Sequence, residues 1–164
     1  MLDFFDKKYQ KPPINDLVFG LYENNINGIE YLYETDKDKW IATAENPAGL
    51  ELILTVIDKG VITDNEYSGY KRCDGMLTSY NHLYFIELKN QKTRWKEKGI
   101  SQLASTIELF NKTHPKKKDE YMNRKAYVCN KKHPYSNIND SERKIAFLRD
   151  YNFRLHIEDK INII

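Results

Sequence analysis

The chain of 164 residues has few of the features that mark several common protein classes. It holds only two cysteines, Cys73 and Cys129, which lie far apart and have no clustered histidines beside them. This spacing excludes a disulfide framework and an ordinary zinc site. Both cysteines fall in strand-like segments, so we expect buried thiols in a reducing cytoplasm.

Other absences exclude further classes of protein. No run of about eighteen apolar residues occurs, so we predict no membrane span. Residues 1–11 lack the basic start and apolar stretch of a secretory signal. Neither of the common glycine-rich phosphate-binding motifs is present. The four histidines have no metal-ligand spacing, and we predict no chemical role for them: His82, His114, His133 and His156.

A composition of 40% hydrophobic and 30% charged residues excludes a disordered or collagen-like chain. The length fits one domain over residues 1–164. Within it we expect a β-rich extension over 1–45, a core over 46–130, and a C-terminal helix and strand over 131–164.

The charges are unevenly distributed although the net charge is only +2. Residues 1–70 hold six basic and thirteen acidic side chains, whereas residues 89–132 hold thirteen basic and four acidic ones. Such a division indicates a polyanionic partner. The alternative is a lysine-rich surface that is merely solvated.

The first half of the chain combines short strands with one ambiguous segment. Alternating runs over 17–23, 29–34 and 39–44 predict an antiparallel meander. Asn46 and Pro47 resemble a helix start, and apolar residues at spacings of three and four predict a helix over 46–59. The β-branched pair Thr55 and Val56 leaves a strand as the alternative.

The second half alternates strands and helices. The patterns predict strands over 72–78, 83–89, 125–130 and 154–163, and helices over 99–111 and 142–151. We therefore expect the α/β class, with a mixed central sheet flanked by helices.

The segment with the clearest chemistry is the hairpin formed by the first two of these later strands. If Tyr80 and Asn81 form a two-residue loop, Asp74 lies directly opposite Glu87, and Lys89 lies on the same face. Two opposed carboxylates destabilise a sheet unless a cation neutralises them. Mg²⁺ would do so, and Lys89 could then orient or deprotonate a metal-bound water. The alternative is a solvent-facing hairpin with ordinary polar residues.

The pattern Asp74 … Glu87-Leu88-Lys89 resembles that of the PD-(D/E)XK nuclease superfamily. The predicted order of elements over about residues 45–130 is similar to the αβββαβ core of that restriction-endonuclease-like fold. The resemblance implies that Asp74 and Glu87 bind a metal ion and that Lys89 is catalytic. Cys73 stands where the family pattern has proline.

Two further residues resemble accessory positions in that family. Glu51 is similar to a carboxylate on the first helix, which implies a third metal ligand. Gln102 is similar to a glutamine on the helix after the lysine strand, which implies a place in the catalytic site. The alternative for each is a polar position on the exposed side of its helix.

A basic loop follows the predicted catalytic strand and is a candidate for substrate binding through Lys92, Arg94, Trp95, Lys96 and Lys98. Its cations would contact phosphates without reading sequence, and Trp95 could stack on a base. The alternative is that Trp95 anchors the loop to the core. The run 116–118 either extends this phosphate track or is a solvated loop.

These patterns lead to one main hypothesis and two alternatives. The main hypothesis is a Mg²⁺-dependent deoxyribonuclease in which Mn²⁺ can substitute, with nucleic acid as its partner. A homodimer could cut both strands, and the acidic N-terminal region offers a face for a protein partner. The first alternative is an inactive module of the same fold that binds nucleic acid or protein. The second is an unrelated α/β protein.

Overall fold

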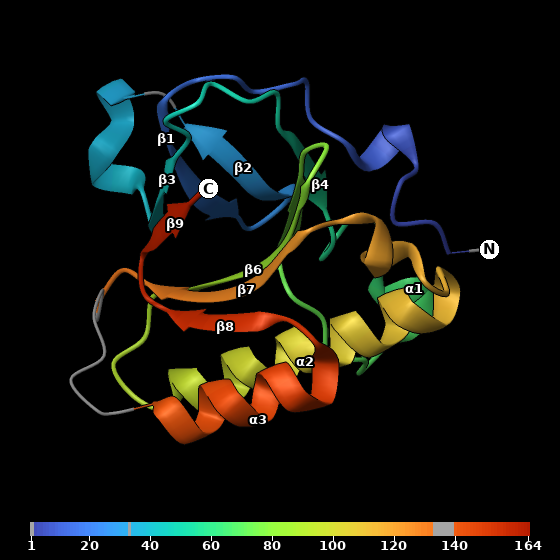
Figure 1. The fold of residues 1–164 in the computed structure, drawn as a ribbon. Helices are drawn as coiled ribbons and strands as arrows, with labels where there is room; N and C mark the ends of the chain where they lie inside the picture. Colours follow the sequence, from blue (N-terminus) through green and yellow to red (C-terminus); the bar gives the residue numbers. More distant parts are fainter. Residues whose placement is uncertain (1, 33, 133–139) are drawn as a thin grey trace.

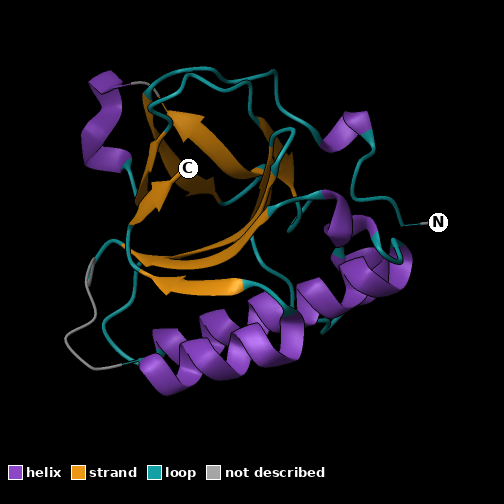
Figure 2. Ribbon diagram, viewed as in Figure 1, coloured by secondary structure: helices purple, strands orange, loops and turns teal. Residues whose placement is uncertain are grey.

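The computed structural model describes residues 2–32, 34–132 and 140–164. The described chain is a mixed α/β structure, as the sequence predicts. Two mixed β-sheets pack against each other, and the two longest helices cover the outer face of the larger sheet (Figures 1 and 2). A second sheet therefore occupies the face on which we expected a helix.

The larger sheet holds the predicted core strands. In spatial order they are β4 (Ile53–Val56), β5 (Gly75–Thr78), β6 (His82–Lys89), β7 (Asn123–Asn130) and β8 (Arg154–Ile157). Strand β5 is antiparallel to both β4 and β6, whereas β7 is parallel to β6 and β8 is parallel to β7. The middle strand β6 is buried along its whole length, which explains its nearly unbroken apolar sequence.

The β5–β6 hairpin has the predicted two-residue loop. The backbone N–H of Ser79 donates to the carbonyl of His82 at 3.0 Å, and Gly75 pairs with Ile86. The regular pairing stops there, because the N–H of Asp74 also donates to the Ile86 carbonyl, at 3.1 Å. Two residues thus face one, as in a β-bulge. The prediction that Asp74 pairs directly with Glu87 is therefore wrong at the level of the backbone.

The predicted helix over 46–59 is absent, and the strand alternative holds. The Asn46 side chain does not cap a helix: its Oδ1 accepts from the Leu50 N–H at 3.0 Å and its Nδ2 donates to the Leu50 carbonyl at 2.9 Å. This closes a turn, after which Leu52 bridges to Ile14 and β4 begins. The β-branched residues of this segment suit that extended backbone.

The smaller sheet is built from the expected N-terminal meander and the end of the chain. Its order is β2 (Gly28–Leu32), β1 (Val18–Asn24), β3 (Ala42–Glu45) and β9 (Lys160–Asn162). The single strand predicted over 154–163 is thus two strands, β8 and β9, in different sheets. The C-terminal segment therefore joins the two sheets, because β9 pairs in parallel with β3.

The first of the two long helices follows its predicted apolar face, whereas the C-terminal helix buries Phe147 and leaves Ile145 and Leu148 exposed. Helix α2 (Trp95–Thr113) begins earlier than expected and buries Leu103, Ile107 and Phe110 against the sheet. Helix α3 (Ser141–Tyr151) lies beside α2 below β8 (Figure 1). The shorter helical turns are η1 (Lys7–Tyr9), η2 (Glu34–Lys39), α1 (Asp64–Tyr67) and η3 (Lys117–Glu120). Within the described residues, no helix combines the length and apolar character needed to cross a membrane.

The contact between α2 and β7 leaves no room for a side chain at Gly99. A Cβ atom there would lie 2.6 Å from Cγ1 of the buried Val128. We predict that Gly99→Ala lowers the free energy of unfolding by about 1–2 kcal/mol, since the overlap outweighs the helix propensity gained. Chemical denaturation measures this. The same change in a Val128→Ala background should cost less, and an equal cost in both backgrounds would contradict the packing argument.

Candidate active site

The candidate site lies at the C-terminal end of β6, where two charged side chains are buried. Glu87 is 2% exposed and Lys89 is 8% exposed. Because they are two residues apart on one strand, their side chains share a face. Lys89 Nζ lies 2.9 Å from Glu87 Oε2, so the two form a buried ion pair.

Gln102 of α2 completes this contact from the helix side. Its Oε1 accepts a hydrogen bond from Lys89 Nζ at 2.5 Å, and its Nε2 donates to the backbone carbonyl of Arg72 at 3.2 Å. The structure therefore brings together Glu87, Lys89 and Gln102, as the resemblance implied.

Asp74 belongs to the same cluster because of the bulge before β5. It is 5% exposed, and its Oδ2 accepts from the N–H of Leu88 at 2.7 Å. Burial and the neighbouring Glu87 raise the pKa of Asp74 well above its usual range. Burial also raises the pKa of Glu87 to about 7, although Lys89 opposes the shift. Asp74 and Glu87 therefore influence each other's protonation.

Glu87 also carries an oxygen with no protein donor. Its Oε1 is buried and has no hydrogen-bond partner among the described residues. An unsatisfied buried carboxylate oxygen is costly in an apolar interior. It becomes favourable when a cation lies beside it, which makes Glu87 a fitting metal ligand.

Two acidic residues that sequence reasoning missed lie beside Asp74. Oxygens of Glu23, Asp58 and Asp74 all lie within 4.8 Å of one another. Opposite ligands of Mg²⁺ or Ca²⁺ lie about 4–5 Å apart, so the three carboxylates could surround one such ion. Glu23 is the next-to-last residue of β1 in the smaller sheet, and Asp58 lies two residues after β4. A strand interpretation of residues 53–57 would have pointed to Asp58, whereas nothing local marks Glu23.

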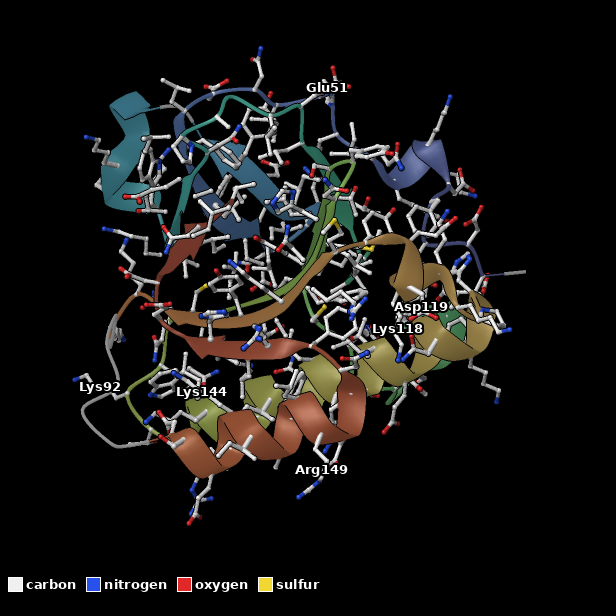
Figure 3. The ribbon with its side chains drawn as sticks, viewed as in Figure 1. Glu51, Lys92, Lys118, Asp119, Lys144 and Arg149 are labelled. Carbon is white, nitrogen blue, oxygen red and sulfur yellow. The ribbon has the colours of Figure 1, made fainter. Side chains whose placement is uncertain are left out.

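Glu51 is not part of this site, so its predicted role as a metal ligand is wrong. It is exposed and lines a hollow beside Ser79, Tyr80 and His82, at the loop end of the β5–β6 hairpin. Figure 3 shows it at the edge of the molecule far from Lys92. The reason is the missing first helix, which was to carry Glu51 to the catalytic strand.

An open cavity of about 530 Å³ adjoins the cluster. Lys89 and Gln102 form part of its wall together with Asp58 and Arg72. Lys98 of α2 and Lys71 of the segment before β5 supply further positive charge, and Lys71 Nζ donates to Ser101 Oγ at 3.0 Å. The cavity therefore has acidic and basic walls.

Only some side chains of the predicted substrate-binding loop are exposed and able to contact a ligand. Lys92, Arg94 and Lys98 are exposed, and Lys98 reaches the cavity. Lys96 Nζ lies 3.3 Å from the buried Asp140. Trp95 is 6% exposed and belongs to the core beneath α2, so the anchoring alternative holds and base stacking does not.

The lysine run 116–118 lies elsewhere. Lys117 pairs with Glu120 at 2.6 Å, and Lys118 lies on the opposite side of the molecule from Lys92 in Figure 3. This arrangement agrees with a solvated loop. Three histidines have local structural partners: His82 bonds Ser79, His114 accepts from the Phe4 N–H, and His156 stacks on Tyr127. His133 lies outside the described residues.

Comparison with known proteins gives no relative for this chain: no family model, curated protein or solved structure matches it. The site is therefore defined by its own geometry as a buried acidic cluster with a lysine, beside an open cavity.

The raised carboxyl pKa values predict how stability depends on pH when a chelator is present. Glu87 retains its proton to about pH 7 in the folded chain but loses it near 4.5 when unfolded. The free energy of unfolding should therefore fall as pH rises between these values, by up to about 3 kcal/mol. Glu87→Gln should flatten the decline in urea titrations. The exposed Glu142→Gln is the control, and a wild-type stability that rises over this range would contradict the prediction.

Proposed function

We propose that the chain is a divalent-metal-dependent hydrolase of phosphodiester bonds, with DNA as its substrate. The observation that carries the proposal is the buried Glu87. One of its oxygens pairs with Lys89, and the other has no protein partner and lies in an acidic cluster. An unpaired carboxylate oxygen can bind a metal ion, and the adjacent lysine can contact an anionic substrate at the same place.

Three carboxylates would hold the ion in this proposal, Glu23, Asp58 and Asp74, and Glu87 lies beside Asp74 as a further acidic neighbour. Mg²⁺, or Mn²⁺ in its place, would activate water and neutralise charge on the phosphate when bound. The carboxylates come from both sheets, which fixes their separation. Since oxygen ligands of this kind are typical for hard cations, the donor set fits Mg²⁺ and Mn²⁺.

Lys89 has the geometry to stabilise charge on the reacting phosphate. An ammonium group has three N–H donors, and two of them are taken by Glu87 Oε2 and Gln102 Oε1. The side chain also lines the cavity, so the third donor remains for a phosphate oxygen. Because Gln102 and Glu87 fix Lys89 in advance, little reorganisation is needed in the transition state.

The cluster also explains why a cation would be required. A phosphodiester is an anion, and the acidic side chains repel it until their charge is neutralised. The basic cavity residues Lys71 and Lys98 would attract the same phosphodiester backbone. Substrate binding and metal binding would therefore support each other.

Substitution of the central residues tests the catalytic proposal. Lys89→Ala and Asp74→Asn should each lower the cleavage rate by about 10²-fold or more, because each removes a charge that acts on the reacting group. Supercoiled, linear and single-stranded DNA and an RNA of the same sequence are incubated with Mg²⁺, Mn²⁺ or EDTA. Lys118→Ala and Asp119→Asn, labelled remote positions in Figure 3, are matched controls.

The outcomes of this assay separate the alternatives. Cleavage that persists in EDTA, or that is unchanged in both central variants, would rule out the proposed mechanism. Binding of DNA without cleavage under any condition would favour the inactive nucleic-acid-binding module. Cleavage of RNA alone would change the substrate but not the site.

Lys98 provides a separate test of phosphate binding. It is exposed at the cavity wall and makes no base-specific contact in the proposal. Lys98→Ala should weaken DNA binding equally for unrelated sequences and lower the salt dependence, log Kd against log [salt], by about one unit. Fluorescence anisotropy at several salt concentrations measures this. Lys118→Ala serves as the control, and a sequence-dependent loss would show that Lys98 reads bases.

A further inference from the structure

Arg72 is the most highly connected cation near the site. Its Nε donates to Asp58 Oδ1 at 2.9 Å, and its Nη2 donates to Asp64 Oδ1. Its Nη1 donates to the backbone carbonyls of Tyr67 and Tyr70, at 3.3 and 3.2 Å. Four of the five N–H donors of the guanidinium are thus occupied by the protein.

These hydrogen bonds distinguish Arg72 from the other cations that line the cavity. Its side chain is only 12% exposed, and the protein has already fixed its orientation. Lys98, in contrast, is exposed at the cavity wall. Arg72 is therefore poorly suited to capture a phosphate and well suited to act as a permanent part of the site.

The guanidinium joins two carboxylates that would otherwise repel each other. Asp58 and Asp64 accept from the neighbouring nitrogens Nε and Nη2, so both lie on one cation. Asp58 also belongs to the cluster with Glu23 and Asp74. It therefore stands between two positive positions, the candidate metal site on one side and Arg72 on the other.

We propose that Arg72 occupies the place of a second metal ion and limits the site to one divalent cation per chain. The inference rests on the proposed function, since it assumes the metal site formed by Glu23, Asp58 and Asp74 with Glu87 beside it. The unpartnered buried oxygen of Glu87 marks that first site independently of Arg72. Asp64 would become a metal ligand only when the guanidinium is removed.

The backbone at Arg72 also contacts the site. Its main-chain carbonyl accepts from Gln102 Nε2, and Gln102 in turn accepts from Lys89. The charge of Arg72 lies against Asp58 without a second ion, since its Nε donates to Asp58 Oδ1 at 2.9 Å. One divalent ion is then sufficient for the cluster.

The stoichiometry of Mn²⁺ binding tests the inference without any cleavage assay. Isothermal titration calorimetry, with electron paramagnetic resonance to count free Mn²⁺, should give one ion per wild-type chain. Arg72→Gln should give a second, weaker ion, and Arg72→Lys, which keeps a cation, should stay at one. Asp64→Asn added to Arg72→Gln should abolish the second ion. Arg149→Gln, which breaks a pair with Asp150 on α3, is the matched control.

Each outcome has a defined meaning. Two ions in the wild-type chain would overturn the inference and leave the proposed function intact. One ion in a folded Arg72→Gln chain would overturn it as well. No Mn²⁺ binding to the wild type would instead overturn the proposed metal site itself. If Arg72→Gln fails to fold by circular dichroism, the wild-type count together with Arg72→Lys still decides: one ion in both supports the inference, and two in either overturns it.

Discussion

The burial of charge at the end of β6 is the constraint on which the site depends. Glu87 and Lys89 are almost fully buried, which is costly unless each charge is paired and hydrogen-bonded. Lys89 is satisfied by Glu87 and Gln102. Among the described residues, the four carboxylates Glu23, Asp58, Asp74 and Glu87 outnumber the cations beside them, which are Lys89, Arg72 and Lys59. Burial raises the pKa of Asp74 and of Glu87, so protonation can offset part of this excess. A divalent cation would offset the same excess.

Two features of the fold hold the excess charge in place. The bulge before β5 turns Asp74 toward Leu88, and the close contact of α2 with β7 fixes Gln102 over the strand end. The smaller sheet then contributes Glu23 from β1. Strand β9 pairs with β3 and follows β8 in the chain, so it joins the two sheets next to which the acidic residues lie.

Local sequence patterns predicted the hairpin well, and contacts between distant segments lay beyond them. Alternation and the Tyr80-Asn81 loop gave the strand register, and the apolar face of α2 left Gln102 at its margin. The helix expected over 46–59 was wrong because spacings of three and four also occur in a strand buried on both faces. Because that helix is absent, Glu51 does not lie at the site. Glu23 could not be found, since its place depends on how one sheet packs on another, which no local spacing encodes.

The strong positive charge of residues 89–132 has a different role from the one that its position in the sequence suggests. Lys96 is held by Asp140, Lys117 by Glu120, and Lys131 by the Asp38 carbonyl, so these cations are tied to the protein. Of that segment, Lys89 and Lys98 reach the cavity. Under the proposed function, the excess would act mainly as a field around the molecule, which would attract a polyanion at long range and weaken with salt. Contact with such a substrate would then be left to a few side chains beside the acidic cluster.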